Sequence, residues 1–177
     1  GNSAPFVLTV GELNTDTSFS GSFTAGAGSV GIIKVGTGNW TLNGPTVDYT
    51  GITVISNGVL QFGSGTSGTI GRSAVISNYS AVAFGRTDTT YAVTNIIDGP
   101  GVLIQRGTGR TTLSPTGGNN TYTGKTFVTN GTLAVANQTA LGAAPGVYVA
   151  DQVTLNGGSL AGTVTQTINN PNRGLAV

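Results

Sequence analysis

Short runs of alternating apolar and polar residues recur along the chain, separated by segments rich in glycine and asparagine. Trp40 and Leu42 share one face of the run 39–43, and Leu60 and Phe62 share one face of a later run. Alternation with a period of two over roughly four to six residues is typical of β-strands that bury one face. Nowhere do apolar residues recur at helical spacing over the length of a helix. The pattern therefore predicts an all-β protein.

The strand-like runs belong to an internal repeat. The stretch 36–62 reads GTGNWTLNGPTVDYTGITVISNGVLQF, and the stretch 107–135 reads GTGRTTLSPTGGNNTYTGKTFVTNGTLAV. The segment that precedes each copy repeats as well, because Asp16 has its counterpart in Asp88, 72 positions later. A fixed internal period is the sequence signature of a repeat architecture.

Many short strands without helices fit a sandwich, a barrel or a solenoid. The matched turns and the length of the repeat favour a parallel β-solenoid, in which each repeat makes about three coils of roughly 24 residues. The pairs Asn57-Gly58 and Asn130-Gly131 are then corners, because glycine adopts positive φ easily and asparagine tolerates it better than most residues. The alternative for these pairs is a type I′ hairpin turn.

The repeat also predicts the domain organisation, which is a single β-solenoid domain over residues 1–177. Repeat 1 spans about 15–62 and is followed by a linker at 63–86. Repeat 2 spans about 87–135, and partial further coils occupy 136–177.

Composition narrows the classes of partner. The chain has seven Lys and Arg residues against six Asp and Glu, a net charge of +1, and 37% of its residues are apolar. It can therefore bury a core, but it has no field that would attract nucleic acid or an anionic membrane. The chain has no run of about 18 apolar residues, so we do not expect this segment to insert into a membrane. Because cysteine is absent, neither a disulfide nor a thiolate metal site is expected.

The motifs GTG-x-x-TL, NTYTG-x-T and NGTL, in this order within 107–133, resemble the passenger-associated β-strand repeat of bacterial autotransporters. The segment 75–91 resembles the linker that leads into such repeats, and Asn172-Arg173-Gly174 resembles their NRG segment. The resemblance implies a right-handed parallel β-helix that is secreted or displayed on the cell surface. It also implies repeats that are structural and carry no catalytic residues. Trp40 departs from the pattern, since the family tends to have leucine there.

The titratable residues predict no catalytic site. Histidine is absent, which removes Ser-His-Asp chemistry and the usual histidine-based zinc sites. The carboxylates are far apart in the sequence, at Glu12, Asp16, Asp48, Asp88, Asp98 and Asp151. Asp88 and its neighbour Arg86 are interpreted as a surface ion pair. We therefore expect neither catalysis nor a cofactor or metal.

Five residues are candidates for contact with a glycan: Trp40, Tyr49, Tyr122, Arg106 and Arg110. The two tyrosines occupy equivalent positions in the repeats and could stack on sugar rings. The other interpretation is that these rings pack in the core or at a corner. The two arginines flank one turn and could meet an anionic glycan, or they could simply be solvated.

The sequence thus predicts a non-catalytic extracellular structural protein, such as a stalk, a surface fibre or an adhesive scaffold. Its expected partners are other copies of the chain bound end to end, or neighbouring repeats of a longer chain, and surface glycans. Head-to-tail assembly into filaments is part of this hypothesis, because open solenoid ends expose strand edges. The alternative is a carbohydrate-binding or polysaccharide-degrading β-helix.

Overall fold

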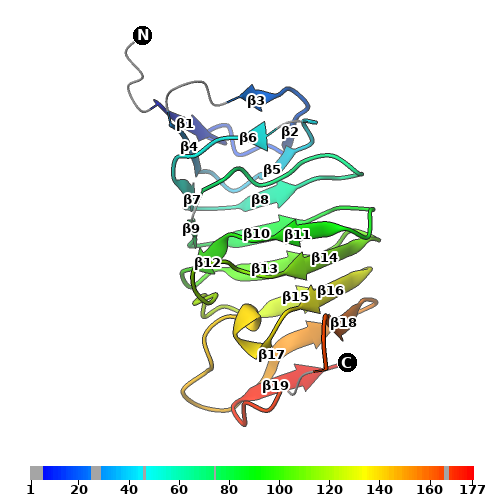
Figure 1. Ribbon diagram of the computed structural model, residues 1–177. Coiled ribbons are helices and arrows are strands. Elements are labelled where there is room, and N and C mark those ends of the chain that lie inside the picture. The colour runs from blue at the N-terminus through cyan, green and yellow to red at the C-terminus, as the bar shows by residue number, and fades with distance from the viewer. Residues whose placement is uncertain (1–5, 25–28, 46, 74, 166–167) are drawn as a thin grey trace.

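The computed structural model describes residues 6–24, 29–45, 47–73, 75–165 and 168–177, and these form an elongated stack of coils (Figure 1). β-Strands make up nearly all of its regular structure. Within the described ranges, the helical element is a single 3₁₀ turn, η1, at Gln138–Leu141. The all-β prediction is confirmed.

The strands pair in parallel and cover three faces. The longest face is an eight-stranded sheet, which we term the long sheet, with the order β2 (Thr17–Phe19), β5 (Asn39–Leu42), β8 (Val59–Phe62), β10 (Ala81–Phe84), β13 (Val102–Gln105), β15 (Thr126–Val128), β17 (Val149–Leu155) and β19 (Arg173–Ala176). The second face is a five-stranded sheet of β1 (Phe6–Val10), β4 (Val30–Lys34), β7 (Thr53–Ile55), β9 (Val75–Asn78) and β12 (Ile96–Asp98).

The third face is split into two sheets. One contains β3 (Phe23–Thr24) and β6 (Val47–Asp48), and the other contains β11 (Tyr91–Val93), β14 (Arg110–Leu113), β16 (Thr132–Val135) and β18 (Ser159–Gly162). On this face, residues 63–73 occupy the position between β6 and β11, and they form no strand. This interruption is the main irregularity of the stack.

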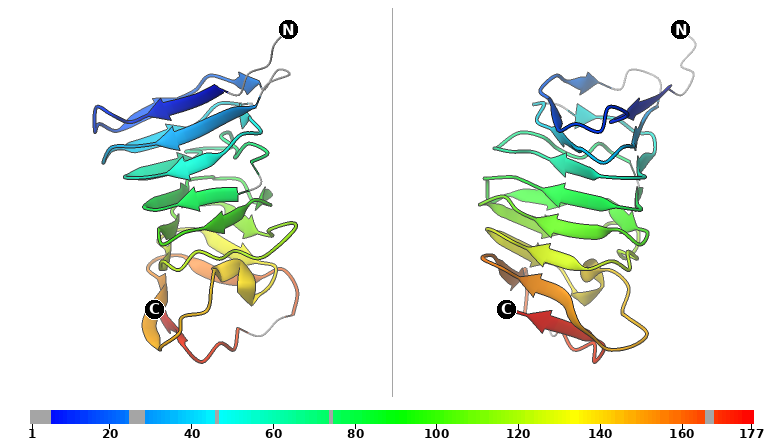
Figure 2. Two further views of the ribbon diagram at one scale, coloured as in Figure 1. Left: turned by 90° about the vertical axis from the view of Figure 1, so that its left-hand side faces the viewer. Right: turned by 180° about the vertical axis from the view of Figure 1, so that it is seen from behind.

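Neighbouring strands of the long sheet are one coil apart in the sequence. Trp40 pairs with Leu60, Leu60 with Val82, and Val82 with Leu103, so each of these coils takes 20 to 22 residues. The later coil between β15 and β17 is longer, because Thr126 pairs with a residue 27 positions away. The whole stack makes about seven turns. Figure 2 shows it from two further sides. The prediction of a parallel β-solenoid is confirmed.

Equivalent strands of the two repeats lie on different faces. β4 belongs to the five-stranded sheet, whereas its counterpart β13 belongs to the long sheet. Likewise β5 lies in the long sheet and its counterpart β14 on the third face. Three coils along the long sheet, from Trp40 to Leu103, span 63 residues, fewer than the 72 that separate Asp16 from Asp88. Each repeat therefore makes three coils and continues through one further face.

Inward-facing side chains of the long sheet stack into columns. Leu42, Phe62 and Phe84 are register partners in successive coils, and none of them is exposed to solvent. The rings of Phe62 and Phe84 stack with centroids 6.2 Å apart. Burying a side chain of this size stabilises the folded state by about 1.5–3 kcal/mol, so the columns supply much of the driving force for folding.

The Asn-Gly pairs form corners between strands of different faces. β15 and β16, which flank Asn130-Gly131, each pair with strands of other coils and not with each other. The same holds for β7 and β8, which flank Asn57-Gly58. Gly131 has a positive φ of 56°, and a Cβ there would meet the carbonyl oxygens of Gly107 and Gly109 in the preceding coil. The corner interpretation is confirmed and the hairpin alternative is excluded.

This corner geometry predicts the effect of adding one methyl group. We expect Gly131→Ala to lower the free energy of unfolding by about 2 kcal/mol, because alanine is strained at positive φ and its Cβ would overlap the backbone below. Gly65→Ala is the matched control, since a Cβ there has no neighbour within 4 Å. Its effect should stay within about 0.5 kcal/mol. Urea unfolding monitored by circular dichroism measures both, and equal stabilities would contradict the role of the corner.

Candidate functional site

The three aromatic candidates for glycan contact lie in the core. Trp40 is 6% exposed, and Tyr49 and Tyr122 are fully buried. The Tyr49 hydroxyl lies 2.8 Å from Thr53 Oγ1, and the Tyr122 hydroxyl lies 2.8 Å from Thr126 Oγ1. Burial raises the pKa of both tyrosines to about 12, so both rings are neutral at physiological pH. The two repeats thus use their equivalent tyrosines in the same internal contact, and the rings present no face to solvent.

The two arginine candidates lie near the surface, on either side of the corner 107–109. Arg106 is partly buried, donates from Nη2 to Asn39 Oδ1 at 2.9 Å, and has its pKa lowered by burial. The Arg110 side chain is partly exposed and has no hydrogen bond or ion pair with the described residues. The structure therefore does not gather the five candidates into one surface.

Asp16, Asp48 and Asp151 are each engaged in a separate structural contact. Asp48 pairs with Arg72 at 2.7 Å, and Asp151 pairs with Lys125 at 2.6 Å. Asp16 accepts the backbone N–H of Asn39 at 2.7 Å. Among the described residues, no cluster of three or more His, Cys, Asp or Glu residues could hold a metal ion. In the same part of the chain, no helix is long and apolar enough to cross a membrane.

A groove of about 690 Å³ lies on the third face, where the sheet is interrupted. Its lining comes from the segment 69–73, the Arg86 and Asp88 side chains, residues in and around β11, and the turn Thr116-Gly117. Hydroxyl groups of threonine and serine predominate among its polar groups, and Ile70 and Ile96 add apolar surface. We term it the third-face groove.

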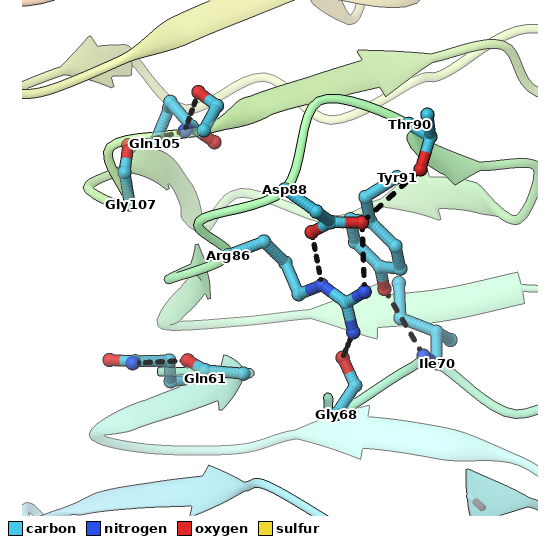
Figure 3. A network of polar contacts seen from close by, with 11 residues as sticks. Gln61, Gly68, Ile70, Arg86, Asp88, Thr90, Tyr91, Gln105 and Gly107 are labelled. Carbon is cyan, nitrogen blue, oxygen red and sulfur yellow. Dashed lines mark hydrogen bonds and ion pairs between the residues drawn. The ribbon is translucent and has the colours of Figure 1, made fainter. Parts of the chain in front are cut away.

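Side chains hold the two walls of the third-face groove together. The Ile70 N–H donates to the hydroxyl of the buried Tyr91 at 3.2 Å (Figure 3). The Asn95 side-chain amide donates to the Gly71 carbonyl at 3.0 Å and also to the Ser73 carbonyl. These bonds take the place of the backbone ladder that joins successive coils elsewhere. The segment 69–73 is therefore fixed beside β11 without pairing with it.

A buried ion pair closes one end of the third-face groove. Arg86 Nε donates to Asp88 Oδ1 at 2.8 Å and Nη2 donates to Oδ2 at 3.0 Å, while Nη1 donates to the Gly68 carbonyl at 3.1 Å (Figure 3). The guanidinium also lies over the Tyr91 ring, with Cζ 4.6 Å from the centroid. The hydrogen bonds from Arg86 hold the pKa of Asp88 below its ordinary value. The predicted ion pair is present, but only 8% of the Arg86 side chain is exposed, so the predicted surface position is wrong.

Sequence reasoning did not identify the third-face groove. The turn-rich segment GSGTSGTIGR at 63–72 was the available signal, because it lacks the alternation of a strand where the third face needs one. The sequence gives no indication of which side chains would meet across that interruption, since Ile70 and Tyr91 lie 21 residues apart.

Together these features define a parallel β-solenoid whose described part has no cluster of three or more potential metal ligands. Two of its segments, residues 32–62 and 103–135, match the model of the passenger-associated-transport-repeat family. The chain carries this family's repeat twice, as the sequence motifs predicted.

A curated relative extends this assignment. Over 153 residues, 86% of this chain, the sequence is 34% identical to the adhesin BmaC autotransporter of Brucella suis biovar 1 (strain 1330). The chain spans only 4% of the length of that relative. No solved structure matches the chain.

The burial of the Arg86–Asp88 pair predicts that substitutions of Asp88 and Asp48 change the free energy of unfolding by different amounts. Asp88→Asn should lower the free energy of unfolding by about 1–2 kcal/mol, because the buried guanidinium loses its charged partner. Asp48→Asn is the matched control and should have almost no effect, since 77% of the Arg72 side chain is exposed.

The same pair makes stability depend on acid. Because the folded-state pKa of Asp88 is lowered, its contribution is present above its unfolded pKa and is lost as the pH falls through the folded value. Urea unfolding between neutral pH and about pH 3 should therefore show a shallower loss of stability in Asp88→Asn than in the wild type. Identical pH profiles would contradict the assigned role.

Proposed function

We propose that the chain is a non-catalytic scaffold segment of an extracellular adhesive protein. The observation that carries the proposal is the unbroken long sheet, whose eight parallel strands join all coils into one continuous ladder. Such a ladder resists bending because each strand is hydrogen-bonded to the coils above and below. The adhesin among its relatives and the repeats found in passengers support a position outside the cell, secreted or on the cell surface.

The distribution of charged groups supports a structural role over an enzymatic one. Polysaccharide-degrading enzymes commonly place two carboxylates about 5 to 10 Å apart beside the substrate. In this chain Asp48, Asp88 and Asp151 are each held by a separate cation. Each of these carboxylates is thus balanced by its own cation, which favours a structural role. Of the five candidates for binding surface glycans, only Arg106 and Arg110 remain, because the aromatic candidates are buried.

Adhesion can be tested with the chain alone. Microspheres that carry the purified chain should be retained on host-cell layers under flow more strongly than microspheres that carry Leu60→Asp. That variant places an unpaired charge in a fully buried position and should unfold the stack. Arg106→Ala with Arg110→Ala tests the contribution of glycans, and loss of retention in this variant would assign them a direct role. Equal retention of wild type and Leu60→Asp would contradict the adhesive part of the proposal.

We also propose that coils of other copies, or of a longer chain, pair with the outermost strands of the long sheet. Among the described residues, β2 and β19 each have one partner in this sheet, so each has an edge that is unpaired there. Unpaired strand edges favour the addition of further strands. Contacts that join unlike ends and do not close produce filaments.

If the chain self-assembles, the size of its particles should depend on protein concentration. Sedimentation velocity of the purified chain should show larger species as the concentration rises, and electron microscopy should show linear particles. Ser18→Pro removes a backbone N–H from β2, which is a terminal strand, and should reduce the larger species. A sedimentation coefficient that stays constant over a hundredfold range, roughly from micromolar upward, would contradict self-assembly.

A further inference from the structure

The third-face groove exposes a strand edge that the fold does not use. β11 pairs with β14 in the register Tyr91 to Thr111 and Val93 to Leu113, and the Val93 carbonyl accepts the Ser114 N–H at 3.0 Å. Successive residues of a strand direct their backbone groups to opposite sides. Since Val93 faces β14, the intervening Ala92 directs its N–H and C=O away from β14 and into the groove.

The backbone groups of Ala92 have no partner among the described residues. Ala92 is exposed, and neither its N–H nor its carbonyl forms a hydrogen bond there. The segment 69–73 would supply the next strand, but it contacts β11 through the Tyr91 hydroxyl and the Asn95 amide instead. An open strand edge in a groove is the arrangement that proteins use to bind peptides by strand addition.

We propose that the third-face groove binds an extended polypeptide segment of a partner protein, which adds as a strand to β11. The added strand would continue the four-stranded sheet of β11, β14, β16 and β18, so its backbone would meet an existing ladder. Ile70 and Ile96 flank the edge and are partly exposed, which gives apolar contacts to alternate side chains of the bound segment.

The groove is less suited to a saccharide. Tyr91 is the aromatic residue in its lining, but it is only 7% exposed and Arg86 covers its ring. No aromatic face in the groove is therefore free to stack on a sugar. Arg86 is also satisfied by Asp88 and the Gly68 carbonyl, which leaves it no free charge for an acidic glycan. The backbone N–H and C=O of Ala92 remain open in the groove, and a peptide backbone complements them.

This peptide site goes beyond the scaffold role and does not depend on it. A chain that binds no peptide can still be a stiff solenoid, and adhesion through Arg106 and Arg110 would survive loss of the groove. Peptide binding and cell retention are therefore measured separately.

The test uses a phage-displayed library of random heptapeptides, selected on the wild-type chain, followed by synthesis of the recovered peptides. Ala92→Pro removes the N–H that faces the groove and should weaken their binding by about tenfold or more. Ala92→Thr keeps this N–H and is the matched control, which should bind with an affinity close to that of the wild type. Calorimetric titration measures the three affinities.

Hydrogen exchange followed by NMR provides a second readout that needs no variant. In the free chain the Ala92 amide should exchange much faster than the Val93 amide, and a saturating recovered peptide should slow it by about tenfold or more. The proposal is overturned if no peptide is recovered, if the peptides bind Ala92→Pro as tightly as the wild type, or if the Ala92 amide is protected in the free chain. The proposal is also overturned if, without peptide, protection of the Ala92 amide from exchange increases with protein concentration. A second copy of the chain would then be the partner of this edge.

Discussion

The parallel backbone ladder between successive coils is the interaction on which the rest of the structure depends. Strands inside the sheets satisfy their N–H and C=O groups with the two adjacent coils, and no helix covers the sheets in the described part of the chain. The ladder fixes the distance between coils, so side chains on the inner side must stack on their counterparts. Leu42, Phe62 and Phe84 meet in this way. It also forces the chain through tight corners, where Gly131 leaves room for the carbonyls of the adjacent coil.

The corners also need hydrogen-bond donors, because their carbonyl groups turn away from the ladder. Lys34 is 1% exposed and donates from Nζ to the Val35 carbonyl at 2.6 Å and to the Gly36 carbonyl at 2.8 Å. Its counterpart in the second repeat, Gln105, is fully buried and donates from Nε2 to the Gly107 carbonyl at 2.9 Å. Burial lowers the pKa of Lys34. Two different side chains thus satisfy equivalent corners, since an unpaired buried carbonyl is costly.

Where the ladder is interrupted, side chains take over its role and a candidate site results. The segment 69–73 lacks the strand pairing of its neighbours, so Tyr91 and Asn95 hold it in place from the next coil. Arg86 adds a bond to the Gly68 carbonyl from the same coil. These contacts stabilise the segment without covering the outer edge of β11. The regular coils supply stiffness, and this interrupted coil leaves backbone groups of β11 available for a partner.

The sequence by itself determined the strands, the corners and the solenoid, because alternation and Asn-Gly pairs are local features that the repeat places at matched positions. Only the tertiary structure decided which face each strand occupies, since this depends on the summed length of successive coils. Because of this summed length, each strand of the second repeat lies one face further along the coil than its counterpart in the first repeat. The sequence offered burial of Tyr49 and Tyr122 as one of two interpretations, and the structure decided for it. The burial of Arg86 and the open edge at Ala92 were beyond the sequence. These features arise from contacts between coils, where residues about twenty positions apart meet.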